Sequence, residues 1–107
     1  MAQINDIQDG TLATYQQYIR QVMVERGFDD ETVSQKFMLL LEQAGELAQA
    51  ARKQANLAQA SDTSIEDCSD AVADVFAVLL DLCNQLNINL EQAFMAREHK
   101  NQDRTWQ

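Results

Sequence analysis

Residues 65–86 constrain the fold of this chain more than any other stretch. Apolar side chains recur there every three or four residues, which is the spacing of a helix that turns one side to a core. The stripe consists of Ile65, Cys68, Val72, Val75, Leu79, Leu82, Cys83 and Leu86, and Phe76 and Leu80 widen it. The middle of this helix is therefore apolar nearly all round, so other helices must cover it on several sides.

Four aspartates share one narrow face of the same helix. Asp67, Asp70, Asp74 and Asp81 fall at offsets of 3, 7 and 14 residues from the first of them, so they line up along one side. Asp74 stands among apolar neighbours, and we expect its carboxylate to be buried. A buried carboxylate needs a partner, because an isolated one loses several kcal/mol or becomes neutral. A metal ion and the basic side chains of another helix both remain open as that partner.

The composition favours a single small all-α domain. The chain has 107 residues, of which 46% are apolar, with no proline and three glycines. This length suffices for one modest core. No apolar run approaches the roughly 20 residues of a membrane span, and residues 1–10 lack the basic and apolar regions of a secretory signal. We expect a cytoplasmic protein.

The net charge limits the classes of ligand and partner that the chain can bind. A net charge of −9 disfavours nucleic acid and anionic membranes, since both attract basic surfaces. An anionic ligand remains possible if a divalent cation lies between it and the carboxylates.

Cys68 and Cys83 lie roughly 22 Å apart along one helix, which is beyond disulfide reach. We expect both to be free core residues in a reducing compartment.

Caps and breakers divide the chain into a loosely attached segment, residues 1–10, and one helical domain, residues 11–107. Gly27 is placed to end the first helix in a left-handed conformation. Asp30 or Thr32 can cap the second helix, and Thr32 with Gln35 fits a capping box there. Ser64 is a cap for the third helix, and Asn89 is a cap for the fourth. The predicted helices cover about 11–26, 31–54, 64–86 and 90–103.

The second and third helices are long and apolar, so they should form an antiparallel hairpin joined by the polar residues 55–64. The predicted core face of the second helix comprises Val33, Phe37, Leu40, Leu41, Ala44, Leu47, Ala48 and Ala51. A chain this short cannot cover the third helix on every side. We therefore expect a homodimer or homotetramer that completes the core.

Facing carboxylates on this hairpin indicate a candidate metal site. Glu42 and Glu46 lie one turn apart on the second helix, and Asp70 and Asp74 lie one turn apart on the third. Hard oxygen ligands of this kind suit Mg²⁺, Mn²⁺ or Ca²⁺. Acidic residues four apart are also common on solvated helix faces, so spacing alone favours neither interpretation.

Three segments read LLLEQAGELAQAARK at 39–53, DAVADVFAVLLDLCNQLNINLEQAF at 70–94 and KNQDRTW at 100–106. Together they resemble the MazG-like family of all-α nucleoside triphosphate pyrophosphohydrolases. The resemblance implies a helical core dimerised or tetramerised through its long helices, with Mg²⁺ as cofactor and Mn²⁺ as a substitute. It also implies hydrolysis of a nucleoside triphosphate to a monophosphate and diphosphate, often as housecleaning of the nucleotide pool.

The acidic motifs of the family are matched in part. Glu42, Glu46 and Asp74 match its metal-binding and catalytic positions, so the resemblance implies these roles for them. Asp70 lies one residue from the position of a further ligand and is a candidate to replace it. The family has glutamate where this chain has Gln43 and Ala71. A glutamine can still coordinate through its carbonyl oxygen, and an alanine cannot.

The C-terminal tail matches the family in its basic and amide residues. Lys100, Asn101 and Arg104 match positions that contact substrate phosphates, and Lys53 is a further candidate for this role. A solvated basic helix end, favoured by the helix dipole, is the alternative interpretation. Trp106 would stack on a base or pack on a neighbouring subunit. Two other functions remain open: a catalytically impaired nucleotide-binding or oligomeric module, and a helical interaction domain without a ligand.

Overall fold

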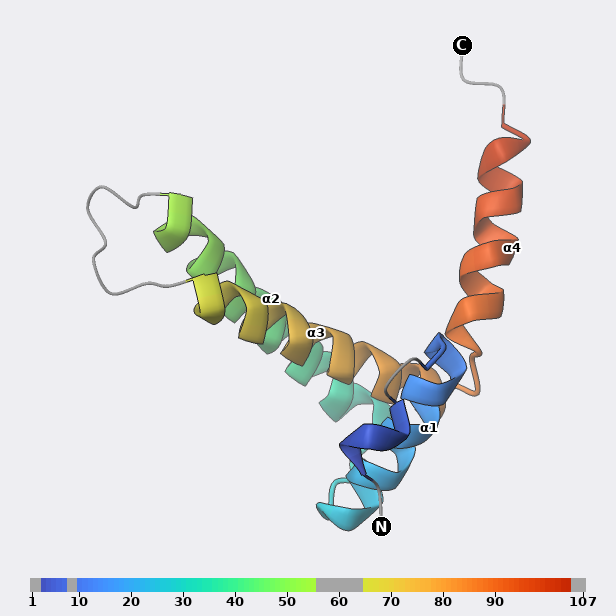
Figure 1. The fold of residues 1–107 in the computed structure, drawn as a ribbon, viewed down its shortest axis with the longest axis horizontal. Helices are drawn as coiled ribbons and strands as arrows, with labels where there is room; N and C mark the ends of the chain where they lie inside the picture. Colours follow the sequence, from blue (N-terminus) through green and yellow to red (C-terminus); the bar gives the residue numbers. More distant parts are fainter. Residues whose placement is uncertain (1–2, 8–9, 56–64, 105–107) are drawn as a thin grey trace.

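The computed structural model describes residues 3–7, 10–55 and 65–104, and all its regular elements within these ranges are helices. The all-α prediction is confirmed. A short 3-10 helix, η1 (Ile4–Ile7), precedes four α-helices, although the sequence indicated no element there. The α-helices are α1 (Leu12–Glu25), α2 (Val33–Ala55), α3 (Ile65–Gln85) and α4 (Leu90–Gln102) (Figure 1).

Local capping sets the helix boundaries close to the predicted ones. Gly27 takes a φ of +78° just after α1, which confirms its predicted role. The backbone N–H of Thr32 donates to Gln35 Oε1 at 2.7 Å, and the N–H of Gln35 donates to Thr32 Oγ1 at 3.1 Å. This capping box is confirmed and begins α2. The predicted cap Ser64, like most of the predicted linker and Trp106, lies outside the described residues.

The turn between α3 and α4 is tight. Asn87 has a φ of +55°, a left-handed conformation that asparagine tolerates better than most residues. The N–H of Ile88 donates to the carbonyl of Cys83 at 2.8 Å, which closes the end of α3. Asn89 then accepts from the N–H of Gln92 at 3.0 Å and caps α4, as predicted. The result is a bend of 94° between the two helices.

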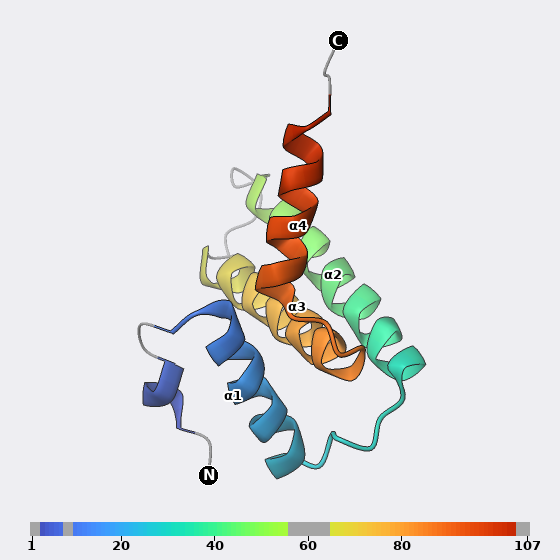
Figure 2. The same ribbon diagram turned by 90° about the vertical axis from the view of Figure 1, so that its right-hand side faces the viewer.

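Helix α3 is the centre of the fold. It lies between α2 on one side and α1 on the other, and α4 leads away from the other helices (Figures 1 and 2). The side-by-side arrangement of α2 and α3 confirms the predicted hairpin. The buried apolar core is small, and it comprises Ile19, Val22, Ala71, Leu80, Leu82 and Cys83. Both cysteines are free, as predicted, and Cys83 is buried in the core, whereas Cys68 is only half-buried.

The predicted core face of α2 is wrong in part. Phe37 is 47% exposed and Leu41 is 73% exposed, whereas Lys36 is 1% exposed. The less exposed residues of α2 are Val33, Lys36, Leu39, Leu40, Gln43, Leu47, Ala50 and Gln54. This stripe includes residues spaced alternately three and four apart, which is the pattern of a helix packed along one partner. Three residues of the stripe are polar, Lys36, Gln43 and Gln54, and the periodicity of apolar residues does not identify them.

Within the described residues, no single helix is both long and apolar enough to cross a membrane. The bent pair 67–85 and 90–102 satisfies length and composition only when its two segments are counted together.

Candidate functional site

A buried ion pair sets the register of α2 against α3. Lys36 Nζ lies 2.5 Å from Asp81 Oδ2, and it also donates to the carbonyl of Phe28 at 3.1 Å. The helices are antiparallel, so equal steps from this pair in opposite directions reach equal heights. Gln43 is seven residues after Lys36, and Asp74 is seven residues before Asp81. These two residues therefore lie at the same level of the hairpin.

The four candidate metal ligands project from one side of this hairpin. Glu42 and Glu46 each directly precede a residue of the α2 stripe, and Asp70 and Asp74 each directly precede a less exposed residue of α3. In an antiparallel helix pair, the positions that precede the contact residues on both helices lie on the same flank. We call this set the acidic flank: Glu42, Glu46, Asp70 and Asp74.

All four carboxylates of the acidic flank are exposed to solvent. None has an ion-pair partner within the ranges that the structure describes. The expectation that Asp74 is buried is wrong: its side chain is exposed, although Asp81, two turns further along the same face of α3, is buried. The carboxylates stay spread along the flank: no three Asp, Glu, His or Cys side chains of the described residues gather closely enough to hold a metal ion.

The buried member of the aspartate row is Asp81, and its partner is a basic side chain. Lys36 has no exposed side-chain surface, and the side chain of Asp81 is 10% exposed. Glu31 Oε1 lies 3.8 Å from Lys36 Nζ and adds a second, weaker carboxylate. The ammonium therefore neutralises Asp81. Sequence reasoning missed Lys36, because a single lysine on an amphipathic helix is usually solvent-exposed.

Gln43 carries an unpaired buried atom between the two arms of the hairpin. Its Oε1 is buried and has no hydrogen-bond partner among the described residues. An unsatisfied buried acceptor costs about 1–3 kcal/mol, and such atoms are rare in native structures. This oxygen lies in the stripe between Glu42 and Glu46. It is therefore a free acceptor for a cation or for a hydrogen-bond donor.

Three of the candidate phosphate-binding residues, Lys100, Asn101 and Arg104, lie apart from the acidic flank of the same chain, whereas Lys53 directly precedes Gln54 of the α2 stripe and lies on that flank. Lys100 is exposed in the last turn of α4, and Asn101 Nδ2 donates to Glu98 Oε1 at 3.3 Å. Asn101 and the exposed Arg104 border one open hollow of about 520 Å³. Figure 1 shows α4 leading away from α2 and α3. Lys53 is exposed in the last turn of α2, away from this hollow.

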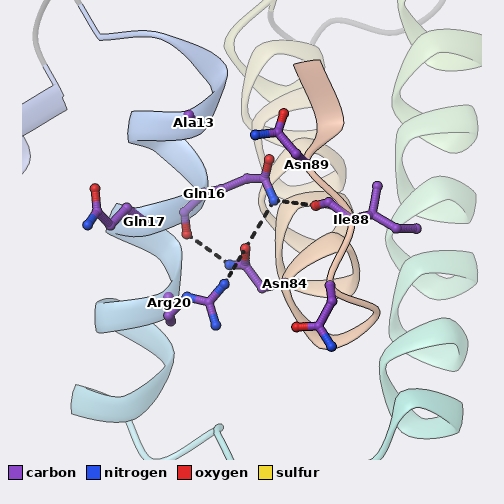
Figure 3. Close-up of a pocket in the computed structure, with 8 residues that line it drawn as sticks. Ala13, Gln16, Gln17, Arg20, Asn84, Ile88 and Asn89 are labelled. Atoms are coloured by element: carbon purple, nitrogen blue, oxygen red, sulfur yellow. Dashed lines mark hydrogen bonds between the residues drawn. The ribbon is translucent and has the colours of Figure 1, made fainter. Parts of the chain in front are cut away.

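A network of side-chain amides joins α1 to the α3–α4 turn. Gln16 Nε2 donates to Asn84 Oδ1 at 3.1 Å and to the carbonyl of Ile88 at 2.8 Å, and Gln16 Oε1 accepts from the N–H of Leu90 at 2.9 Å. Arg20 donates to Asn84 Oδ1 at 3.4 Å. Figure 3 shows these side chains converging at a hollow of about 390 Å³.

This amide network fixes the direction in which α4 leaves α3. Every polar atom of Gln16 is paired, and Gln16 and Asn84 are each 8% exposed. Both residues are therefore structural rather than free to bind a ligand. Sequence reasoning did not find this network. The available signal was the position of Asn84 within an otherwise apolar stretch of α3.

Comparison of this chain with family models, curated proteins and solved structures finds no match. The similarity to the MazG-like family therefore rests on the residues quoted above. The donor chemistry of the acidic flank fits Mg²⁺, which proteins commonly hold through one or two carboxylates while substrate phosphates and water complete the shell. The free Oε1 of Gln43 adds a neutral oxygen donor of the same kind.

Proposed function

We propose that this chain is a Mg²⁺-dependent nucleoside triphosphate pyrophosphohydrolase of the MazG-like type. The observation that carries the proposal is the acidic flank. Four carboxylates without ion-pair partners among the described residues line one side of two antiparallel helices at matching levels. A protein with a net charge of −9 gains no stability from such a row, because like charges repel. A row of this kind is explained by a cation that the folded chain binds.

The proposal assigns roles to the residues of both surfaces. Glu42, Glu46, Asp70 and Asp74 would hold Mg²⁺ or Mn²⁺, and Gln43 Oε1 would accept from a water or ligate the ion. When bound, the ion offsets the negative charge of the substrate phosphates. The basic and amide side chains would donate hydrogen bonds to phosphate oxygens and position the triphosphate. They are Lys53, Lys100, Asn101 and Arg104.

The reaction follows from these roles. A water oxygen bonds to the α-phosphorus, and the bond between this phosphorus and the bridging oxygen breaks, which releases a monophosphate and diphosphate. Glu42, Glu46 or Asp74 accepts the proton of the attacking water. Because α4 leads away from its own hairpin, its Lys100 would reach substrate on the acidic flank of a neighbouring copy. The proposed enzyme is therefore a homo-oligomer.

Release of diphosphate tests the activity. The full chain is incubated with each nucleoside and deoxynucleoside triphosphate at millimolar Mg²⁺ or Mn²⁺. We expect Asp74→Asn to lower kcat/KM at least about tenfold, as loss of a metal-site group commonly does. Asp29→Asn is the matched control, since Asp29 is an exposed aspartate outside the hairpin. If the unaltered chain releases no more diphosphate than Asp74→Asn does, the proposed enzymatic activity is refuted.

A second candidate is a nucleotide-binding or oligomeric module that has lost catalysis. Ala71 favours it, because this residue is 9% exposed at a position where the family supplies a ligand, and it has no donor atom. Thermal unfolding with Mg²⁺ and a non-hydrolysable triphosphate distinguishes the two. A ligand at 100 times its Kd stabilises the folded chain by about 2.7 kcal/mol. Stabilisation without diphosphate release identifies the module.

A further inference from the structure

Gln43 and Ala71 place two uncharged side chains beside the acidic flank. Gln43 directly follows Glu42 on α2, and Ala71 directly follows Asp70 on α3. Gln43 lies at the level of Asp74, because both are seven residues from the buried ion pair. Ala71 is 9% exposed, and its methyl group has no donor atom for a cation. Each arm of the hairpin therefore carries one neutral position next to its two carboxylates.

Gln43 supplies an oxygen without a full charge. Its Oε1 is buried and has no hydrogen-bond partner among the described residues. Because buried acceptors are rarely left unpaired, a donor or a cation from outside the chain is the expected partner. An amide oxygen carries only a partial charge, so it attracts a divalent cation less strongly than a carboxylate does. Gln43 therefore indicates a ligand, but it binds a bare cation weakly.

The four carboxylates of the acidic flank also bind a bare cation weakly. All four are exposed, so water screens their attraction for it. Within the part of the chain that the structure describes, no three acidic, histidine or cysteine side chains gather closely enough to hold a metal ion. Mg²⁺ requires a near-octahedral shell of oxygens and gives up its water reluctantly. The described residues therefore leave most of that shell to other donors.

A triphosphate supplies the oxygens that the hairpin lacks. Its phosphate oxygens carry full negative charges, and several of them from one molecule can reach the same ion. Without a cation, the acidic flank and the net charge of −9 repel the triphosphate. The ion and the triphosphate therefore each favour the binding of the other, and such coupling is reciprocal.

We propose that the acidic flank binds Mg²⁺ and a nucleoside triphosphate only jointly, and binds neither of them tightly alone. The neutral side chain of Gln43 is the residue that makes metal binding depend on the nucleotide. In the chain without nucleotide, the four carboxylates stay hydrated. This inference rests on the proposed function for the identity of the ligand, and it adds how the two components of that ligand depend on each other.

Titration calorimetry on the full chain tests this inference without hydrolysis. The probes are Mg²⁺ alone and the α,β-imido deoxynucleoside triphosphates, each in EDTA and at millimolar Mg²⁺. We expect a Kd for Mg²⁺ alone of about 1 mM or weaker, as in metal sites with few charged ligands. The analogue of a deoxynucleotide that the chain accepts should bind at least about tenfold more tightly with Mg²⁺ than in EDTA.

Substitutions of Gln43 separate its charge from its oxygen. Gln43→Glu adds a charge and keeps the shape of the side chain, and Oε1 has no partner among the described residues to lose. This variant should bind Mg²⁺ alone at least about tenfold more tightly than the unaltered chain. Gln21→Glu is the matched control, because it adds the same charge at an exposed position of α1, and it should bind Mg²⁺ like the unaltered chain.

Gln43→Met keeps the inference testable if the added charge unfolds α2, which circular dichroism shows. Gln43→Met removes the oxygen without adding a charge. It should weaken the joint binding of Mg²⁺ and the analogue at least about tenfold, as loss of a group at a metal site commonly does.

Four results would overturn the inference: micromolar binding of Mg²⁺ alone to the unaltered chain, equal affinity for the analogues with Mg²⁺ and in EDTA, no binding in any combination, or a folded Gln43→Glu that binds Mg²⁺ no more tightly than Gln21→Glu. The diphosphate assay distinguishes these failures from a failure of the proposed function. A chain that releases diphosphate and binds Mg²⁺ tightly alone refutes only the inference. A chain that binds Mg²⁺ and an analogue jointly without releasing diphosphate refutes only the enzymatic activity.

Discussion

The buried pair between α2 and α3 makes a sharp stability prediction. Lys36→Met keeps most of the aliphatic stem and removes the ammonium, so the carboxylate of Asp81 remains buried without its cation. The two side chains are 0% and 10% exposed, so water screens the charge very little. Loss of one partner from a buried pair costs about 3–5 kcal/mol, and the carbonyl of Phe28 also loses its donor. We expect the free energy of unfolding to fall by about 4 kcal/mol.

Urea unfolding followed by circular dichroism measures this change, at one fixed chain concentration because association adds to apparent stability. Glu31→Gln is the control. Glu31 lies 3.8 Å from the ammonium and is 34% exposed, so its loss should cost less than about 1 kcal/mol. The double variant Lys36→Met with Asp81→Leu should be more stable than Lys36→Met alone, since no charge remains buried. The reasoning would be refuted if Lys36→Met lost less than about 1 kcal/mol of unfolding free energy. It would also be refuted if the double variant lost the sum of the two single-variant losses.

Two further predictions concern α3 and its neighbours. Gln16→Met leaves the N–H of Leu90 and the carbonyl of Ile88 without their partners, which should lower the free energy of unfolding by about 2–4 kcal/mol. Hydrogen exchange at the Leu90 amide should accelerate more than exchange in the middle of α2. Equal protection of the Leu90 amide in the variant and the unaltered chain would contradict this role. Burial raises the pKa of the Cys83 thiol above its ordinary value of 9.0. The folded thiol therefore stays protonated while the unfolded thiol ionises, so its contribution to stability is complete below about pH 9 and falls as the pH rises further. Mass spectrometry after alkylation at pH 8 should find the half-buried Cys68 modified before Cys83. Modification of Cys83 as early as that of Cys68 would contradict this.

The predicted site shows which of its features the periodicity of the sequence can predict. Spacing alone placed Glu42 and Glu46 on one face of a helix and Asp70 and Asp74 on another, and the structure puts all four on one flank. Spacing did not reveal that Asp81, in the same row, is paired with a lysine. It also placed Phe37 and Leu41 in the core of one chain, whereas both are exposed. Periodicity identifies an apolar face of a helix, but it does not show which part of that face the rest of the chain covers.

Caps and breakers are local, so the sequence by itself determined the four α-helices to within one or two residues of their observed ends. Thr32 with Gln35, Gly27 and Asn89 act on backbone groups within a few positions of themselves, and the order of residues contains all that such contacts require. Only the tertiary structure decided which polar groups are buried and where α4 points. The pair Lys36–Asp81 joins residues 45 apart and the pair Gln16–Asn84 joins residues 68 apart. Such partners meet only after the helices have packed, because burial makes an ion pair or an amide pair necessary and no local pattern specifies its members.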